Sequence, residues 1–317
     1  VMGGGKLLSF NALFVTFRMP LFFFISGFIL YKNDFEWTLP VSGKFLLKKA
    51  KVQLIPTFFF LAVYTYIFDI SFTNSLFWPD KSGYWFTIAL FEFFLSYVLL
   101  RIICNKLGYK NGVDWLILAA AVIIYFVRRW YLTSGLYEEP MFLLVGMENL
   151  SYFLFFVIGT LARKHYDKIQ KFAENGYIVA ACLLFFFGVI IYKLHESQEM
   201  SSVLSILYLL SRIVGVILVF IFFMKNENLF TQETRLGRAL QYVGRRTLDI
   251  YLLHYFFLPR NLGPIANFFN THQNPSLELF VSLLISILVI CLCLLMSKII
   301  RLSPVLADWL LGVKKKA

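Results

Sequence analysis

Charged residues are scarce in this chain, and apolar residues take their place. Only 15% of its 317 residues are Asp, Glu, Lys or Arg, whereas 59% are hydrophobic and 19% are aromatic. Soluble domains average about 25% charged and about 45–50% apolar residues. A soluble core could not hide this much apolar surface. The composition therefore predicts a polytopic membrane protein, with residues 1–317 forming a single membrane domain.

The chain also lacks the common signatures of metal and nucleotide chemistry. It contains no Gly-rich phosphate loop and no Gly-x-Ser-x-Gly elbow. Its few cysteines fall inside or at the ends of apolar runs, and none has metal-ligand spacing with a histidine. We therefore expect free thiols and no metal site. The cysteines are Cys104, Cys182, Cys291 and Cys293.

Apolar runs long enough to cross a bilayer, which takes about 20 residues, recur along the whole chain. This pattern predicts an all-α transmembrane helical bundle with about nine spans. The connections are brief, so no soluble domain is inserted between them. The predicted spans are 10–31, 52–71, 84–104, 113–132, 141–162, 176–194, 202–224, 247–262 and 277–299.

The net charge of +12 follows membrane topology rather than a nucleic-acid partner. Most lysines and arginines lie in one set of alternate connections, from 44–51 to the C-terminal 314–316. Cytoplasmic loops are enriched in basic residues, so the pattern predicts an inner (cell) membrane protein with a cytoplasmic C-terminus. Nine spans then leave Val1 outside. The simplest arrangement is a ten-helix protein whose first helix precedes Val1, so that this sequence is N-terminally truncated.

The segment from Phe17 to Leu30 places an arginine and a proline at the mouth of an apolar run. A guanidinium at membrane depth costs at least about 3 kcal/mol unless it pairs, snorkels or meets a water-filled cavity. We expect Arg18 to anchor a carboxylate or a developing oxyanion inside the bundle; the simpler interpretation is snorkelling to the outer headgroups. Ser26 and Gly27 remove bulk one turn further in, where another helix or a ligand can approach.

Four segments, in this order, resemble the acyltransferase 3 family of bacterial membrane enzymes, which O-acylate and usually O-acetylate extracytoplasmic glycans. The segment FRMPLFFFISGF (17–28) resembles the family's second helix, and FLLKKAKVQLIP (45–56) is similar to the basic segment that enters its third. YWFTIAL (84–90) resembles the Trp-Phe start of the fourth helix, and RTLDIYLLH (246–254) the late Ile-Tyr-Leu-Leu-His helix. The family's first helix carries an arginine and a catalytic histidine, and no such helix occurs in this chain.

Three lysines are candidates for binding the acyl donor that the resemblance implies. Lys48, Lys49 and Lys51 lie at the cytoplasmic start of the helix predicted over 52–71. At a helix N-terminus the helix dipole and the side-chain charges both favour an anion. We expect them to bind the phosphates of acyl-CoA, preferably acetyl-CoA, as a co-substrate. The alternative is ordinary contact with lipid headgroups.

Other ionisable residues within spans are further site candidates. Arg212 is about mid-span and needs a partner, for which Glu92, Glu148 and Asp249 are the available acids; a structural ion pair explains it as well as catalysis does. Glu92 is deep in its helix, where a paired or protonated structural glutamate is the simpler interpretation. Glu148, in the outer half of its predicted span, is placed to face a sugar hydroxyl of the acceptor.

His254 is the histidine best placed for chemistry within the chain. It lies about two turns into its helix, and as a general base it would deprotonate a sugar hydroxyl. The alternative is a packed histidine with one hydrogen bond. The resemblance gives the larger catalytic role to the first-helix histidine that this chain lacks.

Taken together, the residues and the resemblance predict a membrane-bound O-acyltransferase. It would move an acyl group, expected to be acetyl, from cytoplasmic acyl-CoA to a hydroxyl of a cell-surface or exported carbohydrate. Its partners would be the lipid bilayer, acyl-CoA and the carbohydrate acceptor. Two alternatives stay open. One is a secondary transporter, although no matching pair of interrupted spans marks an inverted repeat; the other is a catalytically inactive truncated homologue.

Overall fold

The structure, a computed structural model, describes residues 10–32, 35–109, 112–133, 146–195, 202–259, 263–272 and 274–312, and every regular element within these ranges is a helix. The α-helices are α1 (Phe10–Leu30), α2 (Leu39–Ile67), α3 (Phe72–Phe77), α4 (Trp85–Lys106), α5 (Val113–Thr133), α7 (Phe153–Lys164), α8 (Tyr166–Glu174), α9 (Gly176–His195), α10 (Ser202–Lys225), α11 (Arg235–Gly244), α12 (Thr247–Phe257), α13 (Gly263–Thr271), α14 (Pro275–Ile300) and α15 (Pro304–Leu310). Short 3₁₀ helices are η1 (Lys81–Gly83), η3 (Met147–Tyr152) and η4 (Glu227–Phe230).

The all-α fold predicted from the sequence is confirmed in the described residues. Five of the helices, α2, α4, α9, α10 and α14, are long and apolar enough to cross a membrane. The count of nine spans stays a prediction. The predicted span 141–162, part of which lies outside the described residues, overlaps the 12-residue α7, which is shorter than expected. The predicted span 247–262, interrupted by Pro259 in the sequence, contains the 11-residue α12. α12 ends ahead of Pro259, which has no N–H to continue a helix.

Helices α1 and α7 share the most extensive helix–helix contact among the described elements. A Cβ added at Gly27 would lie 1.9 Å from the carbonyl oxygen of Phe156, and one at Gly159 would lie 2.0 Å from that of Phe24. Only glycine lets two backbones approach this closely. The expectation of a close neighbour at this point is thus confirmed for Gly27, and the neighbour is a helix.

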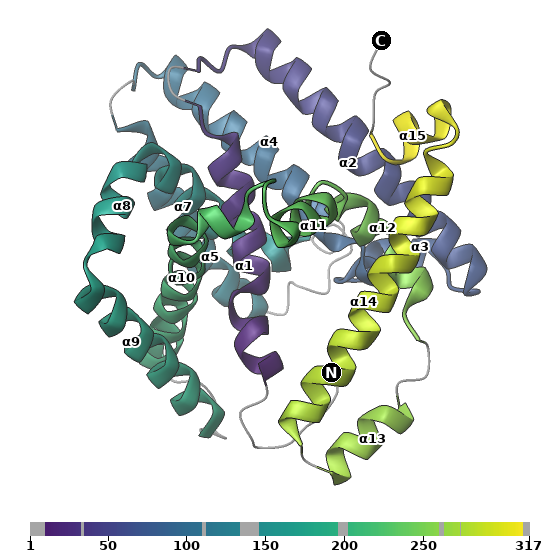
Figure 1. The fold of residues 1–317 in the computed structure, drawn as a ribbon. Coiled ribbons are helices and arrows are strands. Elements are labelled where there is room, and N and C mark those ends of the chain that lie inside the picture. Colours follow the sequence, from purple (N-terminus) through teal and green to yellow (C-terminus); the bar gives the residue numbers. More distant parts are fainter. Residues whose placement is uncertain are drawn as a thin grey trace.

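Two aromatic-rich cores hold the bundle together. The larger is formed by α1, α4, α5, α7 and α10 and includes the fully buried rings of Phe23, Phe93 and Phe156. The smaller joins α2, α12 and α14 around Tyr84 and Leu252. Figure 1 shows α8 and α9 on one flank of the bundle and α14 with α15 on the other, with α1 between them. α1 therefore lies where the two groups of helices meet.

The α1–α7 crossing generates the first prediction. Replacing Gly27 by Ala forces a methyl group into the Phe156 carbonyl, and we expect the free energy of unfolding to fall by about 3 kcal/mol through overpacking. Gly188→Ala is the matched control, since a Cβ there meets nothing within 4 Å and Ala favours a helix by up to about 1 kcal/mol over Gly. Thermal and denaturant unfolding in detergent micelles measure both variants. Equal stability of the two would contradict the close crossing.

Candidate functional site

A cavity of about 470 Å³ lies among α1, α12, α14 and the start of α4; we call it the central cavity. Arg18 and His254, two of the residues singled out in the sequence, both line it. They come from opposite ends of the chain, and only the packing of α12 near α1 brings them to one site. Arg18 is exposed, so its guanidinium is available to a ligand in the cavity.

The local contacts of His254 fix its tautomer. Its Nδ1 lies 2.7 Å from the carbonyl oxygen of Tyr251. A carbonyl can only accept a hydrogen bond, so Nδ1 carries the proton and Nε2 keeps its lone pair. The imidazole also packs on the ring of Tyr255, with centroids 3.8 Å apart. His254 therefore presents a basic nitrogen from a side chain held in one orientation.

One backbone carbonyl accepts hydrogen bonds from two tyrosines that line the central cavity. The hydroxyls of Tyr251 and Tyr255 both donate to the oxygen of Gly83, at 2.9 and 3.0 Å. The Tyr251 hydroxyl also accepts the N–H of Phe86 at 3.0 Å. Gly83 has φ +96°, and a Cβ there would lie 2.0 Å from the Tyr255 ring. No role was predicted for Gly83, Tyr251 or Tyr255 from the sequence. The available signal was the spacing of the two tyrosines, four residues apart on the helix that carries His254.

Asp249 is not the partner of Arg212, and that possibility is wrong. Its buried carboxylate accepts hydrogen bonds from Arg301 and Ser297, each at 2.6 Å, which joins α12 to α14. Arg212 instead donates to the carbonyl oxygen of Thr16 at 3.2 Å. Its guanidinium also lies over aromatic rings, including that of Phe155 at 5.0 Å. Among the described residues Arg212 makes no ion pair, and its contacts are those of a residue that connects helices.

Glu92 and Glu148, the other two acids considered as partners of Arg212, lie near η3. Glu92 is half-buried, and its Oε2 has no hydrogen-bond partner among the described residues. It lies beside the left-handed turn at Gly146, where an added Cβ would be 3.7 Å from the carboxylate. The backbone of Glu148 belongs to η3, but its side chain lies outside the described residues. The structure does not bring Glu92 into the lining of the central cavity.

The three lysines expected to bind the acyl donor do not form one cluster of unpaired, solvent-accessible ammonium groups. Lys51 pairs with Asp308 of α15 at 2.7 Å. The Lys49 ammonium lies 4.3 Å from the centre of the Phe94 ring, which covers it. Lys48 is exposed. The expected position at a helix N-terminus is wrong, because α2 already begins at Leu39 and the three lysines lie within it. In addition, α15 packs on α2 and brings an acid that is distant in sequence to Lys51.

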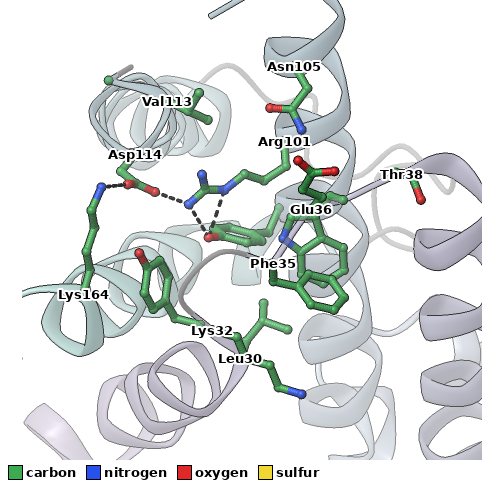
Figure 2. Close-up of a pocket in the computed structure, with 14 residues that line it drawn as sticks. Leu30, Lys32, Phe35, Glu36, Thr38, Arg101, Asn105, Val113, Asp114 and Lys164 are labelled. Carbon is green, nitrogen blue, oxygen red and sulfur yellow. Dashed lines mark hydrogen bonds and ion pairs between the residues drawn. The ribbon is translucent and has the colours of Figure 1, made fainter. Parts of the chain in front are cut away.

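A larger cavity of about 760 Å³ lies at the end of the bundle where α1 ends and α2 begins; we call it the basic-end cavity. Figure 2 shows Asp114 of α5 between Arg101 of α4 and Lys164 of α7, and its carboxylate pairs with both. The hydrogen bond to Asp114 raises the pKa of Lys164, so this ammonium stays charged. Two cations and one carboxylate leave a net positive charge at this wall.

The basic-end cavity is also lined by aromatic rings and by Glu36. Phe35 and Trp37 both line it and pack edge-to-face, with ring centroids 4.7 Å apart. Lys48, Lys49 and Lys51 are not among its lining residues. In the sequence, Arg101 and Lys164 are two of the many basic residues near the ends of apolar runs, and nothing local distinguishes them from the others. Their convergence requires three helices to meet and was not predicted.

Comparison with known proteins gives one result. A family model described as an acyltransferase domain matches residues 2–296, nearly the whole chain. No curated protein and no solved structure matches.

The buried Asp249–Arg301 pair generates the second prediction. Arg301→Gln leaves the Asp249 carboxylate buried without its cation, and we expect a loss of about 3 kcal/mol in the free energy of unfolding. Asp308→Asn is the control, since the Lys51–Asp308 pair is about one-third exposed and such pairs contribute up to about 1 kcal/mol. Denaturant unfolding of the detergent-solubilised protein compares them. Losses of the same size would show that burial does not strengthen the α12–α14 pair.

Proposed function

The chain belongs to the acyltransferase 3 family, and from this premise we propose that it transfers an acyl group, expected to be acetyl, from acyl-CoA to a hydroxyl of a cell-surface or exported carbohydrate. The family and the apolar helices support a multi-pass membrane acyltransferase. We further propose an inner-membrane location with the basic end of the bundle in the cytoplasm, where acyl-CoA is found. The basic loops support this orientation through the positive-inside rule.

One observation carries the proposal: Arg18 and His254 line the same cavity. His254 Nε2 would accept the proton of the attacking hydroxyl as a general base. Arg18 would stabilise the oxyanion that forms when this oxygen attacks the thioester carbonyl. The intermediate then expels the CoA thiolate, which takes up the proton, and leaves the acyl ester on the sugar.

We propose that the acyl donor enters at the basic end. In the basic-end cavity, Arg101 and Lys164 offer cationic groups to phosphates, and Phe35 and Trp37 offer aromatic faces to an adenine ring. Lys48, exposed at the same end of α2, would add to the attraction. α1 connects the two cavities, with Leu30 in one and Arg18 in the other. At 1.5 Å per residue these positions are about 18 Å apart, a span suited to the long pantetheine arm between the phosphates and the thioester.

An acyl-transfer assay tests the reaction itself. Membranes containing the protein expressed from its complete gene are incubated with labelled acetyl-CoA and cell-envelope glycan, and label in the glycan is measured. We expect Arg18→Gln to lower kcat by about 100-fold, the effect of losing one oxyanion-stabilising group. Arg235→Gln, which removes an exposed arginine on α11 outside both cavities, should leave kcat unchanged. No transfer by the parent protein, or an Arg18→Gln variant as active as the parent, contradicts the proposal. Flux of glycan without an acyl donor would instead favour a transporter.

The donor end gives a separate prediction. Lys164→Gln removes a charged hydrogen-bond donor from the basic-end cavity, and we expect the KM for acyl-CoA to rise about tenfold, since such a bond contributes about 1.5–3 kcal/mol. The KM for the glycan should not change. Lys171→Gln is the control, because Lys171 is an exposed lysine on α8 outside the cavity lining. An unchanged KM for acyl-CoA in the Lys164 variant would place the phosphates elsewhere.

A further inference from the structure

A third pocket, of about 570 Å³, lies at the segment that connects α2 to α4; we call it the α3–η1 pocket. α2 begins at the basic end, so this connection lies at the opposite end of the bundle. Its walls carry aromatic rings, among them Trp78 and Trp85, and polar side chains, among them Asn74 and Asp80. It shares Gly83, Trp85 and Tyr255 with the central cavity, so the two hollows adjoin.

The backbone of this pocket is held in an unusual conformation. Lys81 and Ser82 have positive φ values of 47° and 52°, which non-glycine residues seldom adopt. Such backbone persists only where surrounding contacts fix it. Here the buried Lys81 ammonium donates to the carbonyl oxygen of Leu76 at 3.0 Å. The Ser82 hydroxyl donates to the hydroxyl oxygen of Ser75 at 2.9 Å. These contacts hold the segment in this conformation.

The side chains that face the pocket are open to a ligand. Trp78 is 64% exposed, so its ring face is accessible to a ligand in the pocket. The Asn74 amide makes no hydrogen bond within the described residues, although its backbone caps the end of α3. Asp80 uses one oxygen, Oδ1, to accept the N–H of Ser82 at 3.0 Å. An aromatic face next to an amide and a carboxylate oxygen suits a ring with an apolar C–H face and hydroxyl groups at its edge.

We propose that the α3–η1 pocket is the subsite for the acceptor sugar and that it selects a neutral pyranose ring over an acidic one. The proposal rests on the proposed function for the identity of the acceptor. Trp78 stacks on the C–H face of the sugar, while Asn74 and Asp80 hydrogen-bond to its hydroxyls. The shared wall at Trp85 and Tyr255 directs one hydroxyl toward His254. Asp80 is the charged residue of the lining, and a carboxylate there repels the carboxylate of an acidic sugar.

Sugar binding without any acyl donor tests this subsite directly. The full chain in detergent is titrated with the methyl glycosides of glucose, galactose, mannose and N-acetylglucosamine, and with methyl glucuronide as the acidic probe. Saturation-transfer NMR reports binding. We expect at least one neutral glycoside to bind, Trp78→Ala to weaken that binding at least tenfold, and the glucuronide to bind more weakly than the glucoside. Asp80→Asn should reduce the difference in affinity between the glucoside and the glucuronide. Trp115→Ala is the matched control, because Trp115 is 63% exposed on α5, at the basic end.

The outcomes separate this subsite from the proposed reaction. If no neutral glycoside binds at millimolar concentration, or if Trp78→Ala and Trp115→Ala bind alike, Trp78 is an ordinary interfacial tryptophan and the subsite is overturned. Trp78-dependent sugar binding without acyl transfer keeps the subsite and removes the proposed reaction. Acyl transfer with an unchanged KM for glycan in Trp78→Ala keeps the reaction and removes the subsite. Equal binding of glucoside and glucuronide by the parent protein overturns the selection by Asp80.

Discussion

The carbonyl oxygen of Gly83 is the point on which the geometry of the candidate site depends. It accepts hydrogen bonds from two tyrosine hydroxyls of α12, and so fixes the helix that carries His254 against the segment that leads into α4. The same glycine lines both the central cavity and the α3–η1 pocket. A side chain at position 83 would collide with the Tyr255 ring. One backbone turn therefore sets the position of His254 and lines both the central cavity and the α3–η1 pocket.

Charge in this bundle is used in two ways. Asp249 and Arg301 neutralise each other between α12 and α14, and Lys51 is neutralised by Asp308, so these charges stabilise helix packing. Arg18 and the Arg101–Lys164 wall instead line cavities, where a cation can act on a ligand. Burying a charge is costly unless it is paired. Arg101 and Lys164 share one carboxylate, so a net positive charge remains there, and this charge and Arg18 lie at opposite ends of α1, as the proposed path for an anionic donor requires.

The apolar helices could be predicted from the sequence, whereas the ion pairs between helices could not. Hydropathy located the helices because a bilayer requires apolar runs whatever their neighbours are. The pairing of Lys51 with Asp308 joins residues 257 positions apart, and no local pattern encodes it. The same applies to Arg101, Asp114 and Lys164, which three different helices contribute. Asp249 of α12, considered as a partner for Arg212, pairs instead with Arg301 at the C-terminal end of α14.

Composition and motif order determined the all-α membrane class and the acyltransferase 3 family, because both are properties of the linear chain. They also marked Arg18 and His254 as residues of interest, since an ionisable group in an apolar helix is costly wherever the helix lies. Only the tertiary structure decided that these two share a cavity, that the lysines of α2 do not form one open cluster and that a strained turn builds a pocket beside them. The reason is physical: a contact between helices depends on crossing geometry, which close approaches such as Gly27 on Phe156 set, and hydropathy carries no information about it.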